Sequence, residues 1–467
     1  MPQDLALTGW SSLLRREWLP TLAILLGGVL LQSMNVLMVT TVLPSIVREL
    51  GGVAVLNWPT TAYLASSIVA ASCAGALASV IGPRAVYCAG VATFALGALF
   101  CSLAQSMDWI VAGRLVQGFG GGLEAAVAYV VLRETFPEAV WSRAVALMST
   151  SWSVSVLLGP LVGGLFARFG DWRGAFVAAA VVAIVLMAGA FFTLPSAISK
   201  RQASRLGVPA GRVALICLAI AAVSFASVAV WQLAKVGLIV LAIAALAAML
   251  RLDRGASRRL LPSDAFSWST PTGVALWLVL LLSITFSPLQ IYVPLFLQQL
   301  HGLDPLSAGL VVATASLAWS TGSIVTAGAS PSRADRLMSI GPVTMAASLI
   351  ALAVLLPHAA ILWLIPAIAL LGAGIGQCWP FVAQRVMAGA REGDETVAAS
   401  SVPTVQQIGV ALGAATAGVI ANASGLSGAL SDEGVARAAF WLPVSFVVPA
   451  VLALLASLRL SRLWAQR

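Results

Sequence analysis

The chain alternates between apolar runs near 20 residues long and short polar segments, from one end to the other. A helix needs about 20 apolar residues to cross about 30 Å of hydrocarbon, so each run predicts a membrane-spanning helix. The pattern predicts fourteen spans, at residues 19–43, 58–81, 85–105, 109–132, 144–167, 174–194, 212–231, 234–251, 272–298, 306–328, 337–356, 359–388, 398–421 and 438–459.

Two polar segments, 196–211 and 251–271, bracket the seventh and eighth runs, which a very short connector joins into a tight hairpin. The pattern therefore predicts an all-α, polytopic membrane protein with two six-helix bundles and an extra two-helix hairpin between them. We expect residues 1–195 to form the N-terminal bundle, 196–270 a linker with two additional spans, and 271–467 the C-terminal bundle. Transporters are often built from such repeats, with the binding site near the midplane between them.

Composition supports the membrane assignment. Hydrophobic residues make up 60% of the 467 residues, charged residues only 9%, and the mean hydropathy is +0.98. A soluble domain does not tolerate this balance.

The placement of basic residues predicts the orientation. With the N-terminus inside, twenty Lys and Arg residues fall in cytoplasmic segments, whereas five fall outside, namely Arg48, Arg168, Arg173, Lys235 and Arg437. This positive-inside bias predicts a multi-pass protein of the plasma (inner) membrane with both termini in the cytoplasm. The net charge of +9 then reflects topology, and nucleic-acid binding is not expected. The first apolar run is too long for a cleavable signal peptide.

The chain offers little material for metal or nucleophilic chemistry. It has five cysteines, all in apolar runs without metal-ligand spacing, and two histidines, both in predicted outer loops. The cysteines are Cys73, Cys88, Cys101, Cys217 and Cys378, and we interpret them as small core residues. We expect no metal and no cofactor. A membrane enzyme or receptor would need a catalytic cluster or a soluble domain, and the sequence shows neither, so we expect no enzyme.

One acidic residue, Glu124, lies far inside a predicted span, whereas the other 16 of the 17 acidic residues fall at or near the ends of apolar runs. A carboxylate at membrane depth costs about 2.5–3.5 kcal/mol on insertion scales, which makes it a candidate functional residue. Glu124 could carry protons or contact a cationic substrate. The alternative is a neutral side chain that is hydrogen-bonded between helices.

Helical geometry places Glu124 on one face with Arg114, Gln117, Gly121 and Ala128. Lipid would not accept Arg and Glu, so this face should look into a cavity. Arg114 and Glu124 lie about 15 Å apart along the axis, too far for an ion pair. A desolvated carboxyl group without a counter-charge favours its protonated form, which suits a proton carrier.

Four motifs in order, at 75–84, 114–120, 155–164 and 171–173, resemble the major facilitator superfamily, and within it the drug:proton antiporter branch with fourteen spans, the multidrug efflux transporters. Weaker likenesses follow at 293–298 and 406–413. The motif residues are Gly75, Gly82, Arg84, Arg114, Gln117, Gly118, Gly159, Pro160, Gly163 and Gly164.

The resemblance carries expectations for these motifs. In the family, the 159–164 segment is the antiporter motif that seals the outward side and favours export. On physical grounds alone, Pro160 bends the helix and the glycines allow another helix to approach closely. Arg114 is expected to act on conformation, as in the family, rather than to bind substrate.

Two departures from the family pattern change these expectations. The connector has Ser79, Val80 and Pro83 at its usual charged positions, so the charge latch that closes the cytoplasmic side must be weaker or built differently. The first span has Asn35 where the branch has an aspartate. Asn35 cannot exchange a proton near neutral pH, although it could hydrogen-bond substrate or Arg114.

Further polar and aromatic residues in mid-span could line a central cavity for lipophilic substrates. These substrate-cavity candidates are Asn35, Tyr63, Tyr129, Trp152, Gln290, Tyr292, Trp319, Gln377, Trp379, Gln406 and Gln407. Each one alone also fits interhelical packing. Arg385 and the charges at 391–395 should be solvated at the cytoplasmic end of the twelfth span.

The sequence thus favours a monomeric secondary active transporter that exports small amphipathic or cationic compounds by proton antiport, with alternating access and Glu124 as the titrating group. Its expected partners are a small-molecule substrate, protons and the lipid bilayer. The alternative is a facilitator or narrow-specificity metabolite exporter without obligatory proton coupling, which Asn35 and the altered connector motivate.

Overall fold

The structure is a computed structural model that describes residues 9–51, 58–195, 210–228, 231–256, 259–426 and 432–466. These residues form helices and connecting loops, without a strand. The helices are α1 (Trp10–Leu13), α2 (Leu19–Leu50), α3 (Trp58–Ile81), α4 (Pro83–Ser102), α5 (Met107–Thr135), α6 (Glu138–Arg168), α7 (Trp172–Thr193), α8 (Ala210–Val228), α9 (Gln232–Arg254), α10 (Pro271–His301), α11 (Pro305–Thr326), α12 (Pro331–Leu355), α13 (Ile361–Ala388), α14 (Glu395–Ala421) and α15 (Asp432–Ala465); a π-helical turn, Asn422–Leu426, follows α14.

Thirteen of the described helices are long and apolar enough to cross a membrane. The one remaining predicted span, the seventh at 212–231, corresponds to α8, whose apolar stretch within the described residues, Gly211–Val223, is shorter. The all-α, polytopic fold is therefore confirmed. Part of the predicted linker, residues 196–209, lies outside the described residues.

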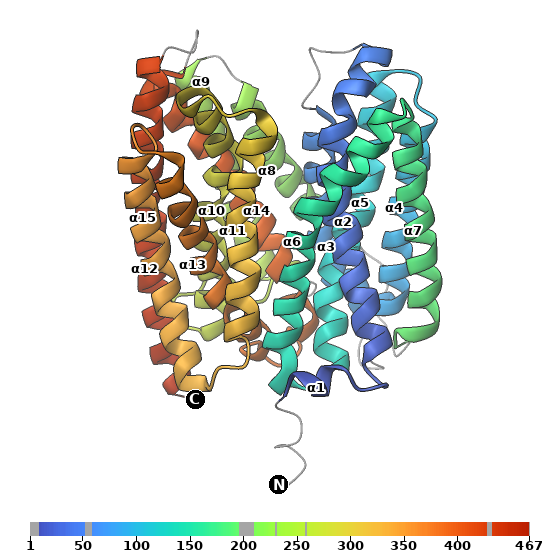
Figure 1. Cartoon of the computed structure of the whole chain (residues 1–467). Coiled ribbons are helices and arrows are strands. Elements are labelled where there is room, and N and C mark those ends of the chain that lie inside the picture. Colours follow the sequence, from blue (N-terminus) through green and yellow to red (C-terminus); the bar gives the residue numbers. More distant parts are fainter. Residues whose placement is uncertain are drawn as a thin grey trace.

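The spans form two groups that stand side by side (Figure 1). In α2–α7, α5 packs against α3 and α4, α2 against α6, and α4 against α7. In α10–α15, α13 packs against α11 and α12, while α10 packs against α14 and α15. We call these groups the N-bundle and the C-bundle. Helix α1 and the last turns of α15 lie at one end of the molecule, here called the terminal end, and the opposite end is the far end (Figure 1).

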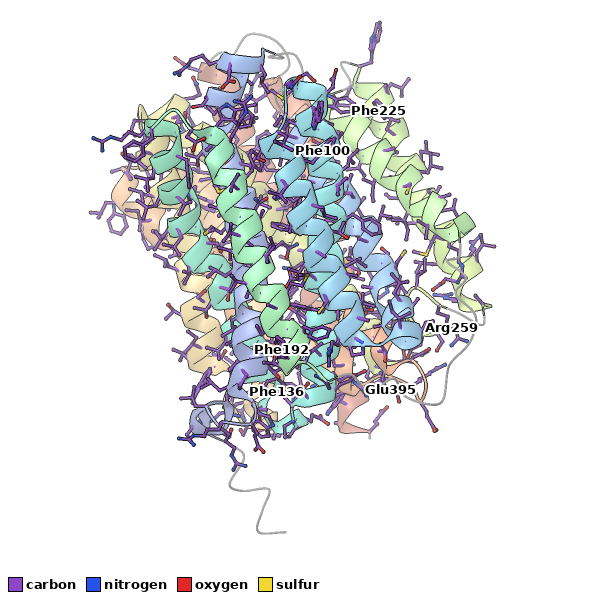
Figure 2. All side chains as sticks on the ribbon, turned by 90° about the vertical axis from the view of Figure 1, so that its right-hand side faces the viewer. Phe100, Phe136, Phe192, Phe225, Arg259 and Glu395 are labelled. Atoms are coloured by element: carbon purple, nitrogen blue, oxygen red, sulfur yellow. The ribbon has the colours of Figure 1, made fainter. Side chains whose placement is uncertain are left out.

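The hairpin of α8 and α9 forms a small unit beside the bundles (Figures 1 and 2). Its two helices pack against each other around Ala219, Ala222, Ala242 and Ala245. It contacts α3 of the N-bundle and α14 of the C-bundle. Its connection to both bundles agrees with the predicted place of the hairpin between them.

Local chemistry explains where several spans begin. Pro is the first residue of α10, α11 and α12, a position where its missing N–H costs nothing. Asp304, before α11, accepts hydrogen bonds from the backbone N–H groups of Leu306 (2.9 Å) and Ser307 (3.1 Å). At the other end of the same loop, Gly302 ends α10 with a φ of 65°, which glycine adopts without strain.

The two bundles meet along the terminal-end half of α6. Ser142 donates to the carbonyl of Ala327 at 2.7 Å, and the hydroxyls of Ser153 and Ser320 lie 2.5 Å apart. Gln384 donates to the carbonyl of Glu138 at 3.3 Å. Within the described residues, positions 154–168 of α6 make no hydrogen bond to the C-bundle. The seam between the bundles is therefore closed by hydrogen bonds at the terminal end and up to mid-span.

Candidate functional site

The site is built on α5, the span with the largest buried share among the N-bundle helices. Ser106 caps its first turn by accepting a hydrogen bond from the backbone N–H of Trp109 at 3.3 Å. The predicted face with Arg114, Gln117 and Glu124 is buried along its whole length. The expectation that this face looks into a central cavity is wrong, because it packs against α2, α3 and α4 inside the N-bundle.

Arg114 is completely buried and is held by neutral groups. Its Nη1 donates to the side-chain carbonyl oxygens of Asn35 (2.5 Å) and Gln117 (2.6 Å). Its Nε points to the carbonyl of Pro59 at 3.4 Å, and its guanidinium lies 4.2 Å from the centre of the Tyr63 ring. Among the described residues no carboxylate forms an ion pair with Arg114. The neutral amide of Asn35 therefore contacts Arg114 at the position where a carboxylate would act as its counter-ion.

Several polar atoms along this face, from Arg114 to Glu124, have no hydrogen-bond partner among the described residues. They are Nη2 of Arg114, Nδ2 of Asn35, Nε2 of Gln117, the Tyr63 hydroxyl and Oε1 of Glu124. A buried polar atom without a partner costs about 1–3 kcal/mol, and such atoms are rare outside functional sites. Their alignment along one buried face of α5 makes this face the candidate site.

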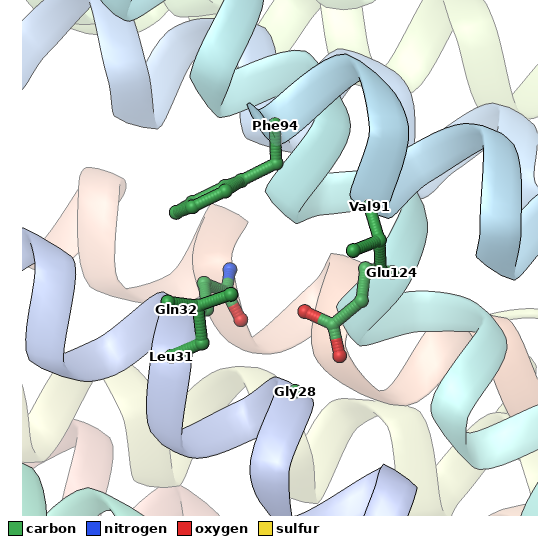
Figure 3. A pocket seen from close by; sticks show the side chains of 6 residues that line it. All are labelled: Gly28, Leu31, Gln32, Val91, Phe94 and Glu124. Carbon is green, nitrogen blue, oxygen red and sulfur yellow. The ribbon is translucent and has the colours of Figure 1, made fainter. Parts of the chain in front are cut away.

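Glu124 faces a small cavity between α2, α4 and α5 (Figure 3). The side chains around it are Gly28, Leu31, Gln32, Val91 and Phe94. The cavity has a volume of about 10 Å³, which is room for one water molecule. A water there would give Oε1 its missing partner.

Gly28 of α2 is required for this geometry. A Cβ at this position would collide with Oε1 of Glu124 and with the hydroxyl of Tyr87, which donates to the carbonyl of Ile24 at 3.0 Å. The absence of a side chain at Gly28 thus leaves the space that the carboxyl group occupies.

Tyr63 and Gln32 fill the distance between Arg114 and Glu124. The Tyr63 ring stacks under Arg114, and its hydroxyl lies 2.6 Å from the point where a Cβ of Gly121 would stand. The Cγ of Gln32 is 3.5 Å from the same point, and Gln32 lines the cavity of Glu124. Arg114, Tyr63, Gln32 and Glu124 therefore form a continuous line of polar side chains inside the N-bundle.

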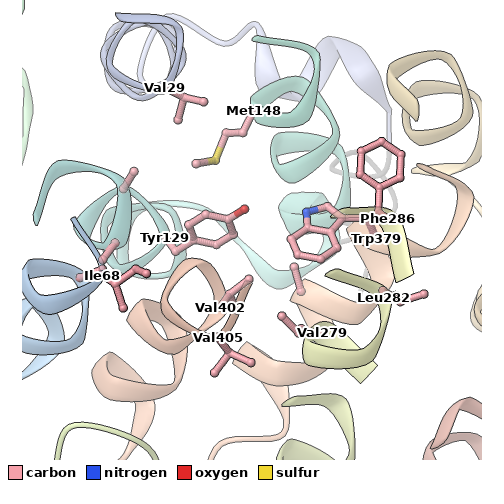
Figure 4. Packing of buried hydrophobic residues seen from close by; sticks show 14 of the residues in the cluster. Val29, Ile68, Tyr129, Met148, Val279, Leu282, Phe286, Trp379, Val402 and Val405 are labelled. Atoms are coloured by element: carbon pink, nitrogen blue, oxygen red, sulfur yellow. The ribbon is translucent and has the colours of Figure 1, made fainter. Parts of the chain in front are cut away.

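Aromatic side chains dominate the facing part of the C-bundle. Trp319 of α11 packs edge-on against Phe286 of α10 (centroids 5.0 Å apart) and against Trp379 of α13 (5.7 Å). Tyr129 of α5 approaches from the N-bundle, with its hydroxyl turned toward the Trp379 indole (Figure 4). The indole nitrogen of Trp319 has no partner among the described residues. This aromatic cluster closes the middle of the seam.

The remaining cavity candidates do not form one lining. Trp152 on α6 is 44% exposed, whereas Gln377 donates to the Thr344 hydroxyl at 3.2 Å and so faces α12 inside the C-bundle. Gln377 therefore points away from the aromatic cluster that contains Trp379. Three further candidates, Gln406, Gln407 and Tyr292, are half-buried. The side chain of Gln290 lies outside the described residues.

The glycines of the antiporter motif are only partly explained by close packing. A Cβ at Gly159 would lie 2.6 Å from Cβ of Leu37, and one at Gly163 would lie 2.7 Å from the carbonyl oxygen of Met38. Both glycines let α6 approach α2. Gly164 has open space around it, so the packing argument does not apply there. Pro160 lies inside α6, which continues to Arg168.

Gly75, Gly82 and Gly118 each serve a backbone requirement. A Cβ at Gly75 would meet Ser400 and come within 3.1 Å of the Val397 Cα, so this glycine lets α3 approach α14 across the seam. A Cβ at Gly118 would collide with the carbonyl of Tyr63 on α3. Gly82 precedes α4 with a φ of 86°.

The altered connector makes no charged contact across the seam in the described chain. Ser79 donates to the carbonyl of Ala76 in its own turn, and the Arg84 guanidinium lies 4.3 Å from the centre of the Phe191 ring in the N-bundle. At the terminal end, hydrogen bonds between α6 and the C-bundle join the two bundles, rather than charged contacts of the connector. The expectation that Arg385 is solvated is wrong, because it is 8% exposed and pairs with Asp335 at 2.8 Å.

Sequence reasoning missed the residues that surround Glu124, namely Gly28, Gln32, Tyr87 and Phe94. Gly28 and Gln32 are four residues apart on α2 and share one helix face, which was a weak sign that this face contacts a polar group. The partner helix could not be inferred from that pattern.

Two groups of membrane-length helices with polar side chains buried inside one of them are typical of a membrane transporter. The family model of the Major Facilitator Superfamily matches residues 25–414, and the chain belongs to this family of transporters.

A Mycobacterium tuberculosis protein named "Probable multidrug-efflux transporter" is 32% identical over 463 residues, which cover 96% of this chain and 95% of the relative. The tetracenomycin C resistance and export protein of Streptomyces glaucescens is 28% identical, over 66% of this chain and 58% of its own length. A solved human organic anion transporter has a similar fold, with a TM-score of 0.71 at 16% identity, covering 95% of this chain and 100% of that structure.

Proposed function

We propose that this protein is a secondary active transporter that exports small amphipathic or cationic compounds in exchange for protons. The names of its relatives, a probable multidrug-efflux transporter and a tetracenomycin C resistance and export protein, support export as the direction of transport. The two bundles would rock about the seam, so that the substrate space opens alternately to either side.

Glu124 is the observation that carries the proton part of this proposal. It is 4% exposed, its Oε1 has no partner among the described residues, and a cavity for one water adjoins it. A carboxyl group in this environment is stable when neutral and costly when ionised, so gain or loss of its proton changes the relative stability of conformations that hydrate it differently. Such a difference couples a proton to the movement of the bundles.

The aromatic cluster supports the substrate class. Trp319, Trp379 and Phe286 bring aromatic rings together at the seam, and movement of the bundles would expose these rings to apolar groups and cations. Trp152 adds an exposed ring on α6. An amphipathic cation would thus be recognised by shape and ring contacts rather than by a fixed carboxylate.

The orientation and the domain organisation belong to the same proposal. The excess of basic residues in segments at the terminal end supports a cytoplasmic location of both termini in an inner membrane. We further propose that residues 1–195, 196–270 and 271–467 act as N-terminal bundle, linker with hairpin, and C-terminal bundle in one monomer.

The test is uptake of ethidium, a fluorescent lipophilic cation, into proteoliposomes with an imposed pH gradient. We expect Glu124→Gln to lose the part of the rate that depends on the gradient. Glu134→Gln, an exposed position on the same helix, is the matched control and should keep it. Unchanged gradient-driven transport in Glu124→Gln would remove this residue from the coupling mechanism.

A facilitator or narrow metabolite exporter without obligatory proton coupling is the second candidate. The contact of Arg114 with the neutral amides of Asn35 and Gln117 favours it, because neither amide can exchange a proton near neutral pH. Wild-type transport that ignores the imposed pH gradient would support this candidate.

A further inference from the structure

A second cavity, of about 450 Å³, lies at the terminal end between the hairpin and the C-bundle. Arg254, from the last turn of α9, lines one part, and Arg391, from the loop before α14, lines another. The segment before α10 contributes Ser263, Ser267 and Trp268. The cavity is thus shared between the end of the hairpin, the segment before α10 and a loop of the C-bundle.

The segment that forms this cavity is held by two buried aspartates. Asp253 of α9 accepts hydrogen bonds from the backbone N–H groups of Leu260 and Leu261, both at 2.9 Å. Asp394 accepts from the backbone N–H of Ser263 at 2.7 Å and from Arg259 at 3.2 Å. The cavity is therefore formed before any ligand arrives.

Backbone strain marks the same place. Phe266, which also lines the cavity, has a φ of 58° and is the non-glycine residue with a left-handed backbone in the described chain. Its carbonyl accepts a hydrogen bond from the Trp277 indole at 2.9 Å, and the two rings pack edge-on. Strain of this kind is retained mostly where the surrounding structure holds a functional geometry.

The charges of the cavity suit an anion. Nε of Arg391 lies 3.6 Å from the carboxylate of the buried Asp264, and the Arg391 side chain is 57% exposed. Nη2 of Arg254 points to the carbonyl of Ala265 at 3.3 Å. Two guanidinium groups against one carboxylate leave a net positive charge, and the guanidinium group is well matched to phosphate oxygens.

We infer that this cavity binds the phosphate headgroup of an anionic phospholipid from the membrane surface at the terminal end. Arg254 and Arg391 contact its phosphate, and the hydroxyls of Ser263 and Ser267 are further donors. Trp268, whose side chain is 47% exposed, lies where the membrane interface favours an amphipathic ring. Basic pockets between spans commonly bind such headgroups. The bound lipid links the hairpin to the C-bundle.

The experiment measures thermal unfolding of the full-length, delipidated protein in detergent, with phosphatidylglycerol, phosphatidylcholine or glycerol 3-phosphate added. Phosphatidylglycerol should raise the unfolding midpoint of the wild type by about 3 °C or more, since a ligand that binds the folded state stabilises it. Arg254→Gln/Arg391→Gln should lose at least half of this shift. Arg333→Gln, an exposed arginine elsewhere at the terminal end, is the control and should keep it.

Native mass spectrometry of the wild type gives a second readout that does not depend on the variants folding. It should show phosphatidylglycerol retained in preference to phosphatidylcholine. Equal retention of the two lipids, or an undiminished shift in the double variant, would overturn the inference. An equal shift with glycerol 3-phosphate alone would assign the cavity to a soluble anion instead of a lipid.

Discussion

The two bundles share one packing scheme but differ in what it encloses. In the N-bundle, α5 places Gly118 and Gly122 against backbone carbonyls of α3, and Gly120 against Gly90 of α4. In the C-bundle, α13 places Gly372 and Gly376 against carbonyls of α11, and Gly374 against Gly341 of α12. Each of the three α13 glycines lies 254 residues after its counterpart in α5, so the central helices of the two bundles occupy equivalent positions.

The same offset pairs the functional positions of α5 with apolar ones. It matches Glu124 with Cys378, Arg114 with Ile368, and Gln117 with Leu371. All three C-bundle residues are buried in the apolar core. The helix frame is therefore kept in both bundles, while at these three pairs of positions the charged side chains occur in the N-bundle. Under the proposed function, this difference corresponds to a division of work, in which the N-bundle handles the proton and the C-bundle supplies aromatic surface for the substrate.

The largest effect should come from the pair at the equivalent positions 124 and 378. Glu124→Gln removes the titrating group, so gradient-driven transport should fall more than about tenfold, the scale expected for a lost proton-transfer group. Cys378→Ser keeps size and charge in the C-bundle and should change the rate less than about twofold. Initial rates of ethidium transport with and without the pH gradient measure both variants. Similar losses in the two would abolish the distinction between the bundles.

Arg114→Lys should give the next largest effect. Lysine lacks the planar guanidinium that bonds Asn35 and Gln117 through one nitrogen and stacks on Tyr63. Leaving those amides unpaired costs about 1–3 kcal/mol, or about fivefold to 150-fold in the population of the active conformation. Transport rate per correctly folded molecule, with folding checked by size-exclusion chromatography, is the measurement. Full activity of the lysine variant would mean that charge alone matters at this position.

Gly28→Ala tests the space that Glu124 occupies. The added Cβ collides with Glu124 and Tyr87, and overpacking of a core costs about 1–3 kcal/mol. We expect slower gradient-driven transport and a lower unfolding temperature. Gly164→Ala places a Cβ in open space and is the matched control. A loss in Gly164→Ala as large as in Gly28→Ala would contradict the packing argument.

Trp319→Phe should affect substrate binding rather than coupling. An aromatic pair contributes about 0.5–1.5 kcal/mol beyond burial, so weakening the contact with Phe286 and Trp379 should raise the KM for ethidium about twofold to tenfold. The ratio of rates with and without the pH gradient should stay at the wild-type value. A change in that ratio would place part of the coupling in the C-bundle.

The smallest effect concerns the loop before α11. Hydrogen bonds from Ser307 and from backbone N–H groups hold the pKa of the Asp304 carboxyl below its usual value. A lowered folded-state pKa stabilises the protein above the ordinary pKa of aspartate, and this contribution is lost as the pH falls through the lowered value. Asp304→Asn should therefore reduce the difference between the unfolding temperatures measured at about pH 6 and about pH 3. This pH interval includes the ordinary pKa of aspartate. An unchanged difference would exclude this carboxylate as a contributor.

The helices could be predicted well from the sequence because the length and apolarity of a segment identify a membrane span, as α5 and α13 illustrate. It also predicted the buried face of α5, since Arg114, Gln117 and Glu124 follow helical periodicity. It could not identify which helix covers that face. The expected central cavity is replaced by contacts with Asn35 and Tyr63, which depend on how α2 and α3 pack.

The misplaced residues show the same limit. Gln377 and Trp379 are two positions apart on α13, and periodicity alone already separates their directions by about 200°. Arg385 resembled a solvated residue because it lies near a helix end, whereas Asp335 of a neighbouring helix neutralises it in the interior. Tertiary partners of this kind leave no trace in a single sequence.

The central claim, that Glu124 carries the transported proton, is tested most directly by proton release on substrate binding. Ethidium is added to the detergent-solubilised protein in weakly buffered solution near neutral pH, and a pH dye records the protons. We predict release of up to about one proton per bound ethidium from the wild type and from Cys378→Ser, and none from Glu124→Gln. Undiminished release from Glu124→Gln would contradict the account.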